Sequence, residues 1–140
     1  MTDKRKQLAH RLMAAHPSDP WRGPEWPASV GDEHIPHREF ETGILWHYHG
    51  PIPATSGACS RHPWGWFPDL DDAATVGVLL DTARKVAEAP RLAVHWFDGT
   101  DDVPLFTEPG WIVDGGDGEN VLAGATDYAE ALVIVIEETR

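Results

Sequence analysis

Apolar residues recur with a helical period at the start of the chain. In residues 3–15, Leu8, Leu12 and Ala15 fall on one side of a helix. Pro17 prevents the helix from continuing. The pattern therefore predicts a short first helix whose apolar side packs inward.

An irregular segment rich in proline and tryptophan follows at residues 17–31. Its four prolines forbid regular structure, because proline has a fixed φ and no backbone N–H. Trp21 and Trp26 lie between the prolines, and we expect their indoles to pack over the chain's own domain. A spacing of this kind is also typical of a peptide that binds an aromatic-lined groove, which is the alternative.

A second helical period begins at Asp71 or Asp72, either of which can cap the helix, and continues to about Ala89. Its apolar residues follow the i, i+3, i+4, i+7 pattern, and Pro90 prevents continuation. The pattern therefore predicts a second helix. Its apolar stripe consists of Val76, Leu79, Leu80 and Ala83, extended by Val86 and Ala87.

Apolar and polar residues alternate with the period of a β-strand in residues 40–49. Ile44, Trp46 and Tyr48 form one face, and the opposite face carries two histidines. Residues 54–68 contain several Gly, Pro and aromatic residues, so we expect a loop there.

Three short strands are predicted in the last third of the chain. Residues 91–97 and 103–107 form two of them, joined by a hairpin at Asp98-Gly99. After a tight turn at residues 108–110, residues 111–113 form the third. The expected apolar face of the first of these strands is Leu92, Val94 and Trp96.

The last element has two interpretations. Asp127 and Glu130 form a capping-box pattern, and apolar residues up to Ile136 fall on one helical face. The β-branched run at residues 133–136 suits a buried strand equally. Periodicity and the cap favour the helix over residues 127–138. The elements together predict an α+β fold, in which two or three helices pack on one face of a small antiparallel sheet of three to five strands. We expect a single compact domain over residues 1–140.

Cysteine content and hydropathy restrict the class of protein. Cys59 is the only cysteine, so an intramolecular disulfide cannot form and a disulfide-built secreted scaffold is excluded. The longest wholly apolar run, residues 131–136, is far too short to cross a bilayer. Basic residues near the N-terminus are not followed by an apolar stretch, so no signal peptide is predicted. These features predict a cytoplasmic protein.

The negative charge is concentrated towards the C-terminus. The formal net charge is −12, and residues 91–140 hold eleven carboxylates against Arg91 and Arg140, a balance of −9. Such a field repels nucleic-acid phosphates and anionic membranes, whereas it attracts a basic protein or a cation. The alternative is that the acidity only keeps the domain soluble. The expected partner-binding residues are Asp98, Asp101, Asp102, Glu108, Asp114, Asp117 and Glu119.

Histidines are the main candidates for chemistry, because five of the eight lie within residues 34–62. His47 and His49 are two apart on a predicted strand, so both side chains extend from one face. With Cys59 and His62 they could complete a tetrahedral zinc site, since imidazole and thiolate are ligands that Zn²⁺ prefers. Such a site is structural if all four bind and hydrolytic if water replaces one. The alternative is an amphipathic strand with two solvent-facing histidines and a buried, inert cysteine.

The sequence thus favours a small acidic binding protein, comparable to an inhibitor, an immunity protein or an assembly subunit, that docks a protein partner. The alternative is a zinc-binding protein or a small metallo-hydrolase. Enzymatic activity is the less favoured interpretation, because it requires the side chains to converge on one point, whereas binding requires only features that the sequence contains. Phosphate-binding loops, GxSxG elbows and HExxH motifs are absent from the sequence, which removes the support for kinases, P-loop enzymes, standard lipases and common zinc proteases. The pattern of residues predicts neither the partner's identity nor the oligomeric state.

Overall fold

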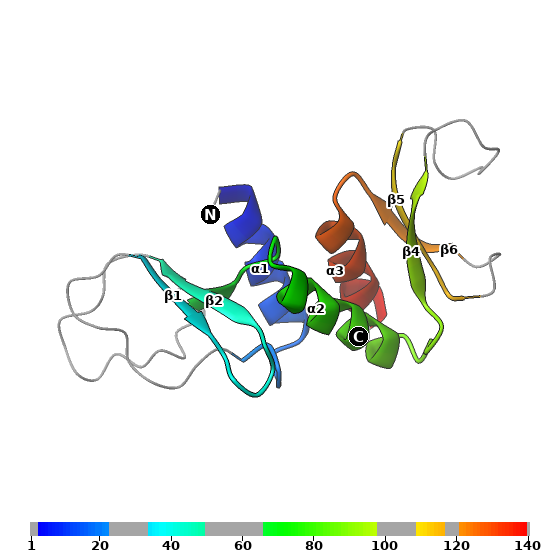
Figure 1. Cartoon of the computed structure of the whole chain (residues 1–140). Helices are drawn as coiled ribbons and strands as arrows, with labels where there is room; N and C mark the ends of the chain where they lie inside the picture. The colour runs from blue at the N-terminus through cyan, green and yellow to red at the C-terminus, as the bar shows by residue number, and fades with distance from the viewer. Residues whose placement is uncertain (1–2, 23–33, 50–65, 98–108, 117–120, 140) are drawn as a thin grey trace. The chain divides into compact units, whose positions relative to one another are not determined.

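The structure, a computed structural model, has three helices and six strands in its described residues (Figure 1). The α+β class predicted from the sequence is therefore confirmed. Within these residues, no helix is long and apolar enough to span a bilayer. The structure describes residues 3–22, 34–49, 66–97, 109–116 and 121–139.

The chain divides into two compact units, Met1–Val78 and Leu79–Arg140, which we call the first and the second unit. The strands form two three-stranded antiparallel sheets, one in each unit, where a single sheet was expected. The single-domain organisation stays a prediction. In chain order the elements are α1 (Asp3–Ala15), β1 (His34–Arg38), β2 (Leu45–His49), β3 (Trp66–Pro68), α2 (Ala73–Val86), β4 (Ala93–Phe97), β5 (Gly110–Asp114), β6 (Val121–Ala125) and α3 (Tyr128–Thr139).

In the first unit the sheet has the order β1-β2-β3. Strand β2 begins only at Leu45, later than expected, because residues 40–42 form a turn. Strand β1 was not predicted, and it contains Pro36 opposite His47. Proline cannot donate a ladder hydrogen bond, but β1 is an edge strand of the described sheet, where proline is tolerated. Strand β3 occupies the end of the expected loop over residues 54–68.

The core of the first unit is formed by α1 and by large side chains of the sheet. Helix α1 has the predicted bounds, and its residues Leu8 and Leu12 are buried as expected. Trp21 from the proline-rich segment is fully buried as well, whereas Trp26 lies outside the described residues. Burying an indole removes more apolar surface from water than any aliphatic side chain does. Further large buried side chains of this core are Ile44, Trp46, Trp66 and Phe67.

Helix α2 begins as predicted, because Asp72 caps it. The Asp72 carboxylate accepts a hydrogen bond from the backbone N–H of Thr75 at 3.1 Å, which satisfies one of the unpaired donors of the first turn. The helix ends at Val86, slightly earlier than the expected Ala89, since Glu88 adopts a positive φ of 54°.

In the second unit the sheet has the order β4-β5-β6, and α3 packs against β5 and β6 (Figure 1). Helix α3 confirms the helical interpretation of the last element, and Asp127 caps it by accepting from the Glu130 N–H at 3.1 Å. Strand β6 was not predicted. It lies so close to Gly110 that a Cβ there would be 2.8 Å from the Ala125 carbonyl oxygen, which explains the glycine. The predicted hairpin and the strand over residues 103–107 fall outside the described residues.

Candidate functional site

The predicted metal ligands are only partly described. His47 and His49 lie on β2 two residues apart, as expected, and the register places His49 opposite His34 of β1. The side chain of His47 is 14% exposed, and its Nε2 lies 2.9 Å from an Asp69 carboxylate oxygen. Cys59 and His62 lie outside the described residues. Among the side chains that the structure describes, no three His, Cys, Asp or Glu residues are grouped to hold a metal ion.

Asp69 belongs to an acidic loop, residues 69–72, that links β3 to α2. Each of its three carboxylates pairs with a basic side chain from a different element of the first unit: Asp69 with His47 of β2, Asp71 with Arg5 of α1 and Asp72 with Arg38 of β1. The described contacts of these carboxylates are therefore internal. Their arrangement joins α1, the first hairpin and the start of α2, and it favours a structural role for the acidic loop.

Asp72 makes the most complete set of contacts in the acidic loop. Its two oxygens accept from Arg38 at 2.9 and 3.0 Å, a two-point geometry that is stronger than a single ion pair. One of them also accepts from the Thr75 hydroxyl at 2.9 Å, and that hydroxyl accepts from the Leu45 N–H at 2.9 Å. The hydrogen bond from Arg38 holds the pKa of Asp72 far below its ordinary value, and Asp72 in turn raises the pKa of Arg38.

One of the seven predicted docking carboxylates is described, and it does not point into solvent. Asp114 is buried at the end of β5. Its Oδ1 accepts from the Gly116 N–H at 2.7 Å, and its Oδ2 lies 3.3 Å from Nδ1 of the exposed His95. Gly116 has a φ of +99°, and a Cβ there would lie 2.4 Å from the Arg91 Cβ, so the turn requires glycine. Asp114 therefore stabilises the end of its strand. The other six lie outside the described residues: Asp98, Asp101, Asp102, Glu108, Asp117 and Glu119.

In the described part of the second unit, three aromatic side chains contact one another in sequence, and we call them the aromatic row: Trp96, Trp111 and Tyr128. Trp96 of β4 contacts Trp111 of β5 edge to face, with centroids 5.2 Å apart and an interplanar angle of 73°. Trp111 contacts Tyr128 of α3 in the same manner, at 5.2 Å and 78°. Trp96 is 53% exposed. Aromatic rings that are held by neighbours and open to solvent are typical of binding surfaces.

Sequence reasoning placed Trp96 on the apolar face of its strand but did not identify it as a surface residue. Leu92, at the start of the expected face, is fully buried, whereas Val94 is half-buried. Alternation shows which residues share a face. It does not show how much of that face is buried by packing, and along β4 the burial decreases from Leu92 to Trp96.

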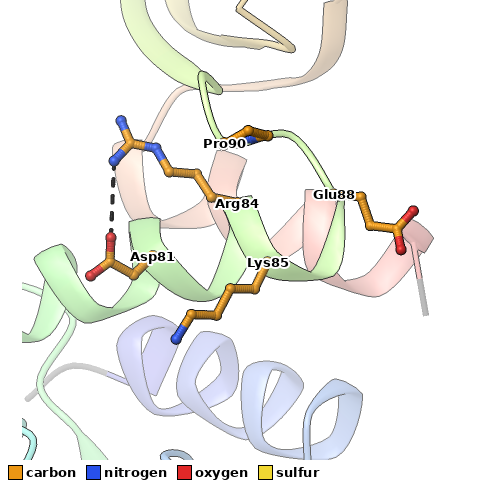
Figure 2. A pocket seen from close by; sticks show the side chains of 5 residues that line it. All are labelled: Asp81, Arg84, Lys85, Glu88 and Pro90. Atoms are coloured by element: carbon orange, nitrogen blue, oxygen red, sulfur yellow. Dashed lines mark ion pairs between the residues drawn. The ribbon is translucent and has the colours of Figure 1, made fainter.

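An open pocket of about 410 Å³ lies beside the C-terminal end of α2 (Figure 2). Arg84 is held there by its Nε, which donates to the Leu92 carbonyl at 3.0 Å, and by Asp81 at 3.9 Å. The pocket contains two cationic and two anionic side chains, none of them buried, so it does not select the charge of a ligand. Its lining residues are Asp81, Arg84, Lys85, Glu88 and Pro90.

The chain matches no protein-family model, no curated protein and no solved structure. The function proposed below therefore rests on the residues of this chain.

Proposed function

We propose that the chain is a small acidic binding protein that docks a basic protein partner on the second unit. The observation that carries the proposal is the exposed indole of Trp96, which Trp111 holds in place. Trp and Tyr are enriched in the residues that contribute most to protein–protein binding, because they bury a large rigid surface at little entropic cost. The proposal includes no catalytic step.

The charge of the second unit indicates the sign of the partner. Residues 79–140 contain 13 carboxylates and four Lys or Arg residues, a formal balance of −9. Pairing between these cations and carboxylates leaves the balance of −9 unchanged. Such a field speeds the encounter with a basic surface and repels acidic ones. The six predicted docking carboxylates outside the described residues are part of this proposal, and so is a cytoplasmic location.

Binding of fluorescein-labelled nona-arginine tests the proposal, measured by anisotropy in 50 mM NaCl with nona-glutamate as the control peptide. Phe40 offers a matched control variant, because it is an aromatic residue in the first unit that is 100% exposed. We expect nona-arginine to bind the wild type and Phe40→Ala equally and Trp96→Ala more weakly. Equal binding to all three proteins, or no binding at all, would contradict docking at Trp96.

A second candidate function is metal binding by the predicted set His47, His49, Cys59 and His62. The contact between His47 and Asp69 favours it, because carboxylates commonly orient imidazoles that bind metals. Elemental analysis of protein purified without chelator tests it, with His49→Ala and Cys59→Ala as variants and His16→Ala as the control. This second function predicts near-stoichiometric zinc in the wild type and the control and its loss in the two variants. Metal-free wild type, or an unchanged content in the variants, would reject this ligand set.

A further inference from the structure

The aromatic row presents one open ring at the edge of the described sheet. In the register of the second sheet, Trp96 lies opposite Trp111, and Trp111 lies opposite Ala125. Trp111 and Tyr128 are half-buried, so Trp96 is the member of the row with the largest exposed fraction. The edge-to-face contact with Trp111 restricts the rotation of the Trp96 indole, because a different rotamer would lose that contact. A ligand that approaches this unit therefore meets one pre-positioned indole.

The described contacts of Trp96 leave part of its ring open to solvent. Successive residues of a strand point to opposite faces of the sheet, so the neighbouring His95 lies on the other face, where it approaches Asp114. In the described part of the chain, the recorded ring contact of Trp96 is with Trp111. Its exposed surface is thus available to a group from outside.

The chemistry of an indole in an acidic unit selects the kind of group. A tryptophan face attracts cations through its quadrupole, and it does so better than tyrosine or phenylalanine. Guanidinium groups also stack on aromatic faces because they are planar and weakly hydrated, whereas an ammonium group is a compact, strongly hydrated charge. Nucleobases stack on tryptophan as well, but their phosphates are repelled by the balance of −9 in residues 79–140. An arginine side chain can both stack on the indole and be attracted by the negative charge of the unit.

We propose that Trp96 is the seat for an arginine side chain of the basic partner, with the guanidinium stacked on the exposed indole. This inference rests on the proposed docking function and adds the identity of the anchoring side chain. It makes Arg and Lys unequal at this surface, although their charge is the same. It also assigns Trp111 and Tyr128 as positioning residues that hold the indole.

Three peptides of equal length test the inference: (Gly-Gly-Arg)₃, (Gly-Gly-Lys)₃ and (Gly-Gly-citrulline)₃, the last being a neutral analogue of the arginine peptide. Each is titrated into the full chain, and the shift of the Trp96 indole N–H resonance is followed by NMR. The resonance is assigned by its disappearance in Trp96→Phe. We expect the arginine peptide to bind about twofold more tightly than the lysine peptide: both cations make a cation–π contact, which at an exposed site contributes at most about fivefold, but the planar guanidinium also stacks on the ring. The citrulline peptide should bind weakest.

The variants separate this inference from the docking proposal. In Trp96→Ala, followed through backbone amide shifts, we expect the preference for arginine over lysine to fall to about one, whereas Trp96→Phe keeps part of it and Phe40→Ala keeps all of it. If both cationic peptides bind equally to the wild type and Trp96→Ala weakens both, docking stands and the arginine seat is wrong. An arginine preference that persists in Trp96→Ala also overturns the seat. If neither cationic peptide binds, the docking proposal itself fails.

Discussion

The acidic residues of the two units have different roles. In the first unit, the acidic loop at residues 69–72 pairs its carboxylates with Arg5, Arg38 and His47 of the same unit. In the second unit, carboxylates outnumber Lys and Arg by 13 to four, and the indole of Trp96 is exposed. Acidic residues with internal partners stabilise a fold. An excess that cannot be neutralised internally instead creates a field, which favours a basic partner.

The largest expected contrast between the units concerns their tryptophans. Trp46 is fully buried in the first unit, so Trp46→Ala should lower the free energy of unfolding by about 3–5 kcal/mol. Trp96→Ala should lower it by about 1 kcal/mol, because the exposed ring loses little more than its contact with Trp111. Urea denaturation followed by circular dichroism measures both. Equal losses would show that Trp96 is part of a core.

The acidic loop provides the next contrast. Asp72→Ala removes the two-point pair with Arg38 and the cap of α2, and it should destabilise the protein by about 2–3 kcal/mol. Asp71→Ala breaks an ion pair whose carboxylate is largely exposed, and it should cost less than about 0.5 kcal/mol. The same denaturation experiment compares the two variants. A neutral Asp72→Ala would remove the structural role assigned to this loop.

A substitution at Asp114 tests whether this carboxylate of the second unit stabilises the fold. Because it is buried and accepts from the Gly116 N–H, Asp114→Ala should lower the free energy of unfolding by about 1–2 kcal/mol. Removing it should leave binding of nona-arginine nearly unchanged when measured on the folded protein. If Asp114→Ala has wild-type stability but loses peptide binding, Asp114 contributes to docking and not to the fold.

The ion pair between Asp72 and Arg38 should also make the stability of the protein depend on pH, with a smaller effect. The pKa of Asp72 is lowered in the folded state, so its contribution to stability is complete above the ordinary value of 3.8 and is lost as the pH falls below it. The free energy of unfolding, measured by urea denaturation between pH 6 and pH 2, should therefore fall by about 1 kcal/mol less in Asp72→Asn than in the wild type. Parallel curves for the variant and the wild type would contradict the lowered pKa.

The sequence predicted the helices more fully than the strands, for physical reasons. An amphipathic helix repeats its apolar positions several times and carries local caps, so α1, α2 and α3 are visible without their neighbours. Strand β1 contains Pro36 and is stabilised by pairing with β2, which depends on residues distant in sequence. Strand β6 has the composition Val-Leu-Ala-Gly-Ala, in which Ala and Gly have low β-propensity. Its partner β5 determines its conformation.

The candidate site shows the same limit. The excess of negative charge towards the C-terminus is visible in the sequence alone. The burial of Asp114 and the exposure of Trp96 depend on how β4, β5 and α3 pack, and local alternation does not encode that packing. The aromatic row joins three elements separated by many residues, so periodicity within any one of them could not reveal it.

The most direct test of a docking surface in the second unit is the salt dependence of association with nona-arginine, measured by stopped-flow fluorescence for the wild type and Trp96→Ala. We expect the association rate of both proteins to fall by at least about tenfold between 50 and 500 mM NaCl, because the field that steers the encounter is screened. Dissociation should be faster in Trp96→Ala, since the anchoring contact is gone. An association rate that is independent of salt, together with equal dissociation rates, would contradict the account.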